Sequence, residues 1–464
     1  MARGEVEDIQ LVFPSKVNEE YRFTFDRNLK GIQISARELK KMNGYYDALV
    51  PFKNQLKCTD TLTAVWITVQ CPSRVPVGKY HQTIKIEGSK HFTIQLDYNV
   101  HHTTIPLKSS IPITVGVENR CVAEGLNDKE ADKERQRWVD FVLSYRMTPV
   151  FGTQITPERW QYEHSFSPWA WNDKRSIRLL NDRRYSCYML PFFTLSENEL
   201  ASLLCNIQKK GKLKESLFYI WDEPAYMEDY EQIKQKVNII RKYASDARIL
   251  TTFFCGPRNG PRKGDLYAVF DYLKHHIHVA TISLAPCKGN EEEVQHIRYK
   301  VPEGIDWWSY VCWQPGGNEP NFLLQMKGIQ QRAIMWRTWK NGSQGFLYWN
   351  CNIYHKRNPF TYITDMPHGD GILIYPGDIL GRKGPIASAR LERWRDGAEE
   401  MELLRLVEKN YSKEKADTLL NIVYSSPLSF IEKAHNIPFF RKELLDQLDK
   451  TIPIDYKLRI TDFI

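Results

Sequence analysis

An adjacent pair of carboxylic acids, Asp222 and Glu223, follows an apolar run and precedes Pro224. Two acids at the end of a buried strand can exchange protons with a substrate and stabilise positive charge, as glycosidic-bond hydrolysis requires. The same three residues could instead begin a helix, because Asp is a preferred N-cap residue and Pro is favoured in the first turn. Neighbouring strand residues also point to opposite faces. Both acids can therefore serve one substrate only if the strand ends and the chain turns there.

Aromatic, amide and acidic residues in and after two later apolar runs form a second group that could do chemistry. Aromatic rings stack on the C–H faces of sugars, and amides and carboxylates bind sugar hydroxyls. The predicted substrate-binding residues are Tyr310, Trp313, Trp349, Asn350 and Asp370. For the three aromatic residues, the alternative is that their rings fill the protein interior. Trp307 and Trp308 are neighbours on one expected strand, so we predict that one points inward and the other outward.

The sequence indicates neither a cofactor nor a metal site. The 12 His residues show no HExxH or comparable ligand spacing. The 9 Cys residues are an odd number without CxxC spacing, which predicts neither a zinc site nor a disulfide framework. The segment Gly369-Asp370-Gly371 lacks the Lys-Ser/Thr of a phosphate-binding loop, so we predict a turn there.

The composition is typical of a soluble globular protein, with 42% hydrophobic and 26% charged residues in a chain of 464. The net charge of +8 is spread along the chain, so nucleic-acid binding is not expected. No apolar run is long enough to cross a bilayer, and the first residues, MARGEVEDIQ, lack the apolar core of a signal peptide. We expect a soluble protein, periplasmic or secreted if a leader was removed. Its compartment and oligomeric state stay open.

Strands that alternate with amphipathic helices must position these side chains, and this pattern is typical of a parallel α/β fold. We predict eight strands, at 111–118, 149–152, 185–193, 216–221, 248–254, 278–284, 306–313 and 345–350. Eight strands with intervening helices predict a (β/α)8 TIM-type barrel, whose active site lies at the C-terminal strand ends. An open Rossmann-like sheet is the alternative if two strands are miscounted, but the sequence lacks GxGxxG.

The barrel is predicted to be one of three domains: a β-sandwich at 1–108, the catalytic barrel at 109–410 and a C-terminal helical extension at 411–464. The sandwich is predicted from short β-rich runs at 21–25, 32–35, 64–70, 80–86 and 92–100. Pro76-Val77-Gly78 predicts a hairpin connection between the run around Trp66 and the next run. A long helix is predicted at Ser388–Asn410, with further helices after it.

The run Tyr219-Ile220-Trp221-Asp222-Glu223-Pro224 resembles the catalytic motif of glycoside hydrolase family 123, the β-N-acetylgalactosaminidases, and of uncharacterised relatives that share the catalytic domain. Later segments are similar to the family signature in order and spacing, at 345–350, 368–371, 375–377, 388–392 and 395–397. The resemblance covers residues 110–410, and the region around Trp66 resembles a shorter form of the family's β-sandwich. Arg390, Arg395 and Asp396 match the signature too. We expect them to tie a helix to a loop and do not predict them as site residues.

The resemblance implies a retaining exo-β-N-acetylgalactosaminidase in which the 2-acetamido oxygen of the sugar attacks C1. Glu223 would protonate the leaving oxygen and later deprotonate water, and Asp222 would hold the acetamido N–H and stabilise the oxazolinium. Adjacent acids suit this mechanism, because a two-carboxylate retaining mechanism places its acids across the scissile bond. Glu223 needs a raised pKa for this role, and the Asp222 carboxylate and nearby aromatic residues would raise it.

The partner implied by the resemblance is a carbohydrate, the end of a glycan or glycoconjugate, and no cofactor is implied. Two alternatives stay open. The same fold could act on a different glycoside, or the chain could be a carbohydrate-binding protein that has lost catalysis. The presence of both carboxylates, Asp222 and Glu223, favours catalysis.

Overall fold

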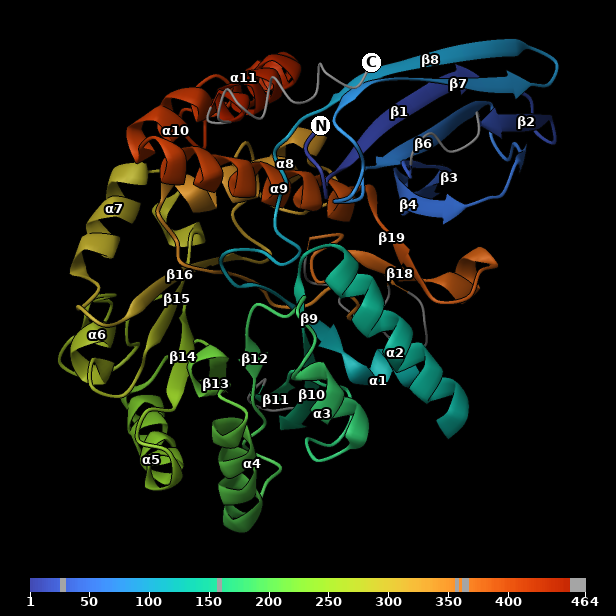
Figure 1. Ribbon diagram of the computed structural model, residues 1–464. Coiled ribbons are helices and arrows are strands. Elements are labelled where there is room, and N and C mark those ends of the chain that lie inside the picture. Colours follow the sequence, from blue (N-terminus) through green and yellow to red (C-terminus); the bar gives the residue numbers. More distant parts are fainter. Residues whose placement is uncertain (26–30, 157–160, 355–358, 361–366, 451–464) are drawn as a thin grey trace.

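The computed structural model describes residues 1–25, 31–156, 161–354, 359–360 and 367–450. Figure 1 shows a ring of parallel strands surrounded by helices, antiparallel sheets built from the N-terminal strands, and C-terminal helices packed where these two parts meet. The predicted α/β class, with a barrel, N-terminal sheets and C-terminal helices, is confirmed.

The ring contains eight parallel strands, one for each predicted strand. They are β9 (Ile113–Glu118), β10 (Thr148–Thr156), β12 (Tyr188–Met189), β13 (Ser216–Trp221), β14 (Arg248–Phe253), β15 (Val279–Ser283), β16 (Asp306–Val311) and β17 (Phe346–Tyr348). Neighbours pair in the order β10-β9-β17-β16-β15-β14-β13-β12. At the remaining seam the hydroxyls of Thr148 and Ser186 lie 2.8 Å apart, so the barrel is nearly closed. A ninth strand, β11 (Gln161–Ser165), pairs antiparallel with β10 and is absent from our prediction.

Helices cover the outside of the ring (Figure 1). They are α1 (Asn119–Ala123), α2 (Asp128–Ser144), α3 (Lys174–Leu179), α4 (Glu197–Lys209), α5 (Met227–Tyr243), α6 (Ala268–Leu273), α7 (Glu291–Lys300) and α8 (Gly328–Lys340), with short 3-10 turns at Leu213–Glu215 and Ala285–Cys287. The buried residues of α5 follow helical spacing: Tyr230, Ile233, Val237 and Ile240. Such a stripe forms one apolar face, which packs on the strands.

Strand side chains alternate between the barrel interior and the surrounding helices. Leu250, Trp308 and Tyr310 belong to the interior cluster, whereas Trp307 packs in the cluster shared with the helices. The prediction that Trp307 and Trp308 point in opposite directions is therefore confirmed. Interior residues at the C-terminal strand ends face the mouth of the barrel, where a barrel enzyme has its active site.

The N-terminal strands form two four-stranded antiparallel sheets. One contains β1 (Val6–Pro14), β6 (Leu62–Gln70), β3 (Gln33–Met42) and β4 (Tyr45–Pro51); the other contains β5 (Gln55–Lys57), β2 (Glu20–Phe25), β7 (Gly78–Glu87) and β8 (His91–Val100). An apolar cluster with residues from both sheets includes Phe23, Ile67 and Ile84. The predicted hairpin at Pro76-Val77-Gly78 is wrong, because β6 and β7 belong to different sheets. This segment instead carries the chain from one sheet to the other.

The C-terminal part begins with a short hairpin of β18 (Ile374–Pro376) and β19 (Pro385–Ala387), around a 3-10 turn at Gly377–Leu380. The long helix α9 (Ala389–Asn410) confirms the predicted helix, and Ser388 caps it by accepting a hydrogen bond from the Leu391 N–H. It is followed by α10 (Lys413–Leu420), a 3-10 helix at Ile431–Asn436 and α11 (Ile437–Asp449). The end of the predicted extension, 451–464, lies outside the described residues. Within the described ranges no helix is long and apolar enough to cross a membrane.

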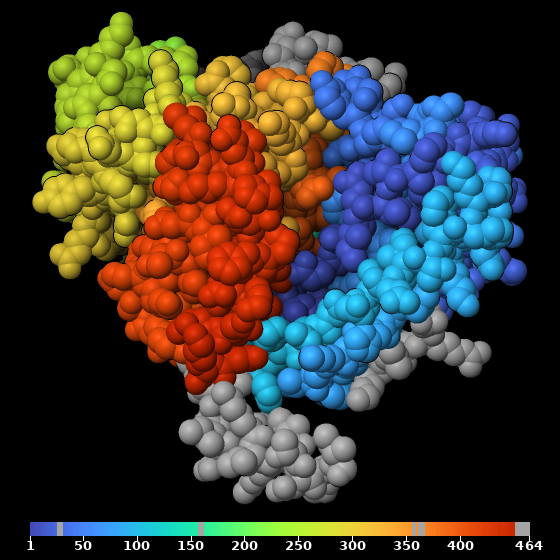
Figure 2. All heavy atoms as spheres, turned by 90° about the horizontal axis from the view of Figure 1, so that it is seen from above, coloured from blue at the N-terminus to red at the C-terminus, as the bar shows by residue number. Residues whose placement is uncertain are grey.

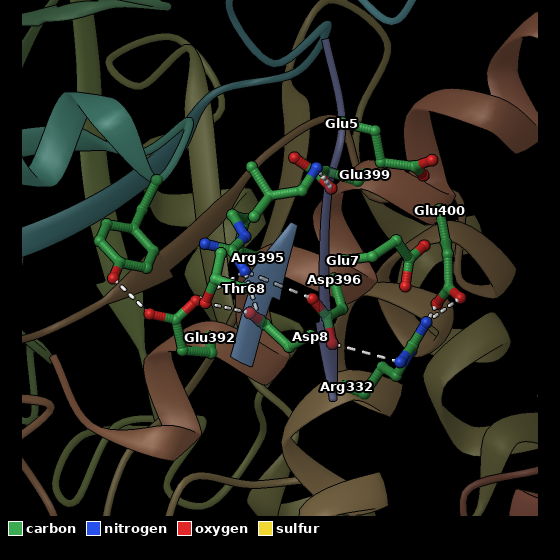
Figure 3. Close-up of polar contacts among 12 residues, drawn as sticks. Glu5, Glu7, Asp8, Thr68, Arg332, Glu392, Arg395, Asp396, Glu399 and Glu400 are labelled. Carbon is green, nitrogen blue, oxygen red and sulfur yellow. Dashed lines mark hydrogen bonds and ion pairs between the residues drawn. The ribbon is translucent and has the colours of Figure 1, made fainter. Parts of the chain in front are cut away.

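Buried charges join α9 to the barrel and to the N-terminal sheets (Figure 3). Arg395 lies 2.5 Å from Asp8 of β1 and 2.6 Å from Glu392 of its own helix. On the barrel side, Arg332 of α8 lies 2.5 Å from Glu400 and 3.2 Å from Asp396. In Figure 2 the red C-terminal helices lie against both the yellow barrel helices and the blue N-terminal sheets. Arg395 and Asp396 therefore tie α9 to a strand and to another helix, and not to a loop as we expected.

Candidate active site

Asp222 and Glu223 lie at a turn where β13 ends. The pairing of β13 with β14 shifts register between Tyr219 and Trp221, the last residue of the strand. Glu223 then adopts a φ of 45°, in the left-handed region that non-glycine residues rarely enter. The strand therefore ends and turns here, which is the condition under which both acids can serve one substrate. Asp222 is exposed and Glu223 is half-buried.

Two hydroxyl groups hold the Asp222 carboxylate. The Tyr219 hydroxyl and the Thr252 hydroxyl each donate a hydrogen bond of 2.7 Å to Oδ1 of Asp222. The second carboxylate oxygen, Oδ2, receives no hydrogen bond from the described residues. His164 of β11 stacks on the Tyr219 ring, with the ring centroids 4.2 Å apart and the planes 20° from parallel. This stacking limits the movement of Tyr219 and so supports its bond to Asp222.

Among the described residues, the hydroxyl of Tyr310 is the direct hydrogen-bond donor to the Glu223 side chain, and it donates to Oε1. Its backbone N–H donates to Oγ1 of Thr252 at 2.9 Å. Burial and the neighbouring Asp222 carboxylate raise the pKa of Glu223 to about 7, while the Tyr310 bond and the Arg258 charge oppose this increase. Glu223 can therefore hold a proton near neutral pH, as a general acid must.

A cavity at the mouth of the barrel lies beside the acidic turn. Its lining includes Gly116, Tyr219, Asp222, Trp349 and Asn350. Trp349 is half-buried and Asn350 is buried, with its Oδ1 accepting a hydrogen bond of 2.9 Å from the Asn352 N–H. Gly116 has room only for hydrogen, because a Cβ there would lie 1.8 Å from the carbonyl oxygen of Trp349. This close contact fixes the chain that carries Trp349 and Asn350 against β9.

Asp370 lies behind the wall of this cavity. Its Oδ1 accepts hydrogen bonds of 3.0 Å from the Tyr348 hydroxyl and 3.0 Å from Nε1 of Trp349. Only 3% of its surface is exposed, and burial raises its pKa to about 6. The contacts of Asp370 thus orient the Trp349 indole, and direct contact between Asp370 and a sugar stays a prediction.

Trp313 lies apart from the cavity lining. It is 42% exposed, and its ring stacks on Phe254 with the centroids 6.5 Å apart. Trp313 follows β16 and Phe254 follows β14, so both rings lie at the C-terminal ends of barrel strands. The structure therefore gathers Asp222, Trp349 and Asn350 around one cavity, joins Tyr310 to Glu223, and leaves Trp313 as an exposed ring at the strand ends.

Tyr219, Thr252 and His164 are absent from the predicted site. The strand order carries a signal for Thr252: the fifth barrel strand lies beside the fourth, and period-two alternation places Thr252 on the same face as Leu250. Burial lowers the pKa of His164 to about 4, so its imidazole is neutral at physiological pH. In the part of the chain that the structure describes, no three His, Cys, Asp or Glu side chains are grouped as metal ligands.

A barrel with paired acids at a strand end and an aromatic wall beside them is suited to binding and cleaving a carbohydrate. Residues 133–407, more than half of the chain, match the family model described as glycoside hydrolase 123, catalytic domain. The chain therefore belongs to glycoside hydrolase family 123, whose members hydrolyse glycosides.

Among solved structures, a family 123 glycoside hydrolase from Clostridium perfringens, analysed for glycolipid glycan hydrolysis, is similar to this chain. The match covers 97% of this chain and 92% of the other, with a TM-score of 0.69 and 15% identity, and shows a shared fold. A glycosyl hydrolase family 2 member from Bacteroides cellulosilyticus matches 77% of this chain and 45% of its own, at 11% identity and a TM-score of 0.32. No curated protein matches the chain in sequence.

Proposed function

We propose that this chain is a retaining exo-β-N-acetylgalactosaminidase that uses the 2-acetamido group of its substrate as the nucleophile. One observation carries the proposal: Asp222 and Glu223 meet at one turn, where hydroxyl groups hold the first and burial raises the pKa of the second to about 7. Two different environments give two adjacent acids two different roles.

Glu223 is the general acid and then the general base. In the first step the acetamido oxygen attacks C1, the bond from C1 to the leaving oxygen breaks, and Glu223 gives its proton to that oxygen. In the second step water attacks C1 of the oxazolinium, the bond from C1 to the acetamido oxygen breaks and restores the 2-acetamido group, and the Glu223 carboxylate takes the water proton. A pKa of about 7 suits both directions near neutral pH.

Asp222 orients the acetamido group. Both hydroxyl donors bind Oδ1, so Oδ2 can accept the acetamido N–H of the substrate. The negative charge of the carboxylate then stabilises the positive charge that develops on the oxazolinium. Because Tyr219 and Thr252 hold the carboxylate before substrate arrives, little reorganisation is needed during the reaction.

The other acids near the strand ends already accept structural hydrogen bonds, which argues against a carboxylate nucleophile. Glu118 accepts the Arg120 N–H at the start of α1. Glu163 accepts the backbone N–H groups of Phe192 and Thr194, and Asp370 accepts the Trp349 N–H. Asp222 is the only acid among the described residues that line the cavity. The 2-acetamido oxygen can supply the missing nucleophile.

We propose that the sugar is bound by the predicted residues Tyr310, Trp349, Asn350 and Asp370, and that Trp313, outside the cavity lining, contacts a more distant part of the substrate. In this proposal Trp349 stacks on the sugar, Asn350 binds a hydroxyl, and Asp370 supports the indole or binds the sugar itself. The similarity to a hydrolase named for glycolipid glycans supports the end of a glycan or glycoconjugate as the substrate class. A galacto configuration is favoured by the family.

The first experiment measures release of the aryl group from β-linked N-acetylgalactosaminide, N-acetylglucosaminide and galactoside. We expect cleavage to require the 2-acetamido group, and we expect a thiazoline mimic of the intermediate to inhibit far better than the product sugar. On an unactivated β-N-acetylgalactosaminide, Glu223→Gln should lower turnover by roughly 10²-fold or more, while Glu228→Gln on α5 serves as a matched control. Efficient cleavage of the galactoside without thiazoline inhibition would refute substrate assistance, and binding without cleavage of any glycoside would indicate a carbohydrate-binding protein.

A further inference from the structure

The Thr252 hydroxyl connects the two members of the acidic pair. Thr252 lies on β14 and is 1% exposed. Its Oγ1 accepts the backbone N–H of Glu223 at 2.9 Å and donates its proton to Oδ1 of Asp222 at 2.7 Å. A hydroxyl has one proton to donate and two lone pairs. The Thr252 hydroxyl is therefore an acceptor in one contact and the donor in the other.

The barrel itself places Thr252 at this position. Trp221 pairs with Thr251 across β13 and β14 after the register shift, so Asp222 is level with Thr252, one residue further along. Alternation then points Thr252 to the barrel interior, where Leu250 also lies, and points Thr251 to the outside. Thr251 is also fully buried, and its hydroxyl has no partner among the described residues.

We infer that Thr252 is a positioning residue for the reaction, a role that rests on the proposed function of Asp222 and Glu223. Through the backbone N–H it stabilises the turn at Glu223, where a φ of 45° is unfavourable for a residue with a side chain. By donating to the carboxylate of Asp222, the Thr252 hydroxyl fixes the orientation of that side chain. The Thr252 hydroxyl thus contacts both the proton donor and the group that orients the acetamide, and it shares the second contact with the Tyr219 hydroxyl. A misplacement of about 1 Å can cost roughly 10²-fold in rate.

The same contact affects the charge balance around Glu223. The titratable and charged groups near Glu223 are Asp222, Tyr219, Tyr310, Arg258 and Cys312, and of these Asp222, Tyr310 and Arg258 affect its pKa. After burial, the Asp222 carboxylate contributes most to the raised pKa of Glu223. If Asp222 turns away when the Thr252 hydroxyl is lost, the pKa of Glu223 must fall.

The test compares Thr252→Val, which removes the hydroxyl at nearly constant volume, with Thr252→Ser, which keeps it. Thr251→Val is the matched control, because it makes the same change at the neighbouring buried position. On the aryl glycoside that the wild type cleaves, Thr252→Val should lower kcat by roughly 10- to 100-fold, with a smaller change in KM. Thr252→Ser should retain most of the activity, and Thr251→Val should match the wild type. Thermal unfolding of all three variants confirms that each is folded.

A second measurement needs no substrate. The carboxyl carbon of 13C-labelled Glu223, assigned by its absence in Glu223→Gln, is titrated by NMR. We expect a lower midpoint in Thr252→Val than in the wild type, Thr252→Ser and Thr251→Val. Equal kcat and equal midpoints in the Val and Ser variants of Thr252, or an equal loss in Thr251→Val, would overturn the inference. Failure of the proposed function appears elsewhere, as a wild type that does not cleave 2-acetamido glycosides, and the titration still decides the role of Thr252.

Discussion

Replacing Tyr310 by Phe removes the hydrogen-bond donor of the Glu223 side chain and should shift the pH dependence of the enzyme. The Tyr310 hydroxyl stabilises the ionised form of Glu223, so its loss raises the pKa of Glu223. A hydrogen bond to a charged group contributes about 1.5–3 kcal/mol, and a pKa change of one corresponds to about 1.36 kcal/mol. Because Glu223 is half-buried, water screens part of this contribution and the lower end of the range applies. The pKa should therefore rise from about 7 to about 8.

The sign of the kinetic effect follows from the proposed role of Glu223 as the general acid. A general acid must be protonated in the free enzyme, so kcat/KM falls as the pH rises through its pKa. In the wild type this decline should be centred near pH 7, where burial and Asp222 place the pKa of Glu223. In Tyr310→Phe the decline in kcat/KM should move to higher pH, by about one pH unit.

The assay measures kcat/KM for an aryl N-acetylgalactosaminide between pH 5 and 9, a range of about two pH units on either side of the expected wild-type pKa. Tyr188→Phe is the control, because Tyr188 is equally buried and its hydroxyl donates to the Leu180 carbonyl, away from the acidic turn. It should leave the profile unchanged. A Tyr310→Phe profile that declines at the wild-type pH, or at a lower pH, would refute the assignment of the decline to Glu223 and its bond to Tyr310.

Two further predictions concern the cavity wall and the buried charges. Asp370→Ala should lower kcat/KM by roughly 10-fold, because it removes the acceptor that orients the Trp349 indole. Asp370→Asn keeps an acceptor oxygen for Nε1 of Trp349 and should retain most activity. Equal losses in both variants would instead favour direct contact between the Asp370 carboxylate and the sugar. Arg395→Met should lower the free energy of unfolding by about 3 kcal/mol in urea denaturation, because it removes one of the two arginines that pair with the buried Asp8 and Glu392 and leaves only Arg37 beside them. A loss below about 1 kcal/mol would show that the Arg395 pairs contribute little.

The barrel strands could be predicted from the sequence because each is a short apolar run between helical segments. The missed strands lack that signal. β1 reads VEDIQLVFP and buries few residues fully, and β5 has only 3 residues. β4 carries Asp47, which is rare in strands, yet Asp47 is buried because Arg390 lies 2.9 Å away. That partner is 343 residues further along the chain, so no local pattern reveals it. The domain boundaries at 108 and 410 stay predictions.

The acidic pair could be predicted from its motif, but its supporting residues could not. Asp222 and Glu223 are recognisable because their types and order suit the proposed chemistry. Thr252 and Tyr219 act through the register of β13 against β14, including the shift between Tyr219 and Trp221. A shift of one residue turns a side chain to the other face of a strand. The supporting residues are therefore determined by tertiary pairing, and a single sequence contains no direct record of it.

The N-terminal sheets contribute to the proposed site indirectly, through Arg390. Asp47 of β4 accepts two hydrogen bonds from Arg390, from Nε at 3.1 Å and from Nη2 at 2.9 Å. The other nitrogen, Nη1, donates to the Gly369 carbonyl at 2.8 Å, next to Asp370, which in turn binds the Trp349 indole. Asp47, Arg390 and Asp370 are buried, and a buried charge without its partner is costly, so these contacts stabilise the support behind the Trp349 indole. The N-terminal sheets thus help to position the aromatic wall of the cavity, while β13 and β14 position the two acids. The two sides of the proposed site are therefore supported by separate parts of the fold.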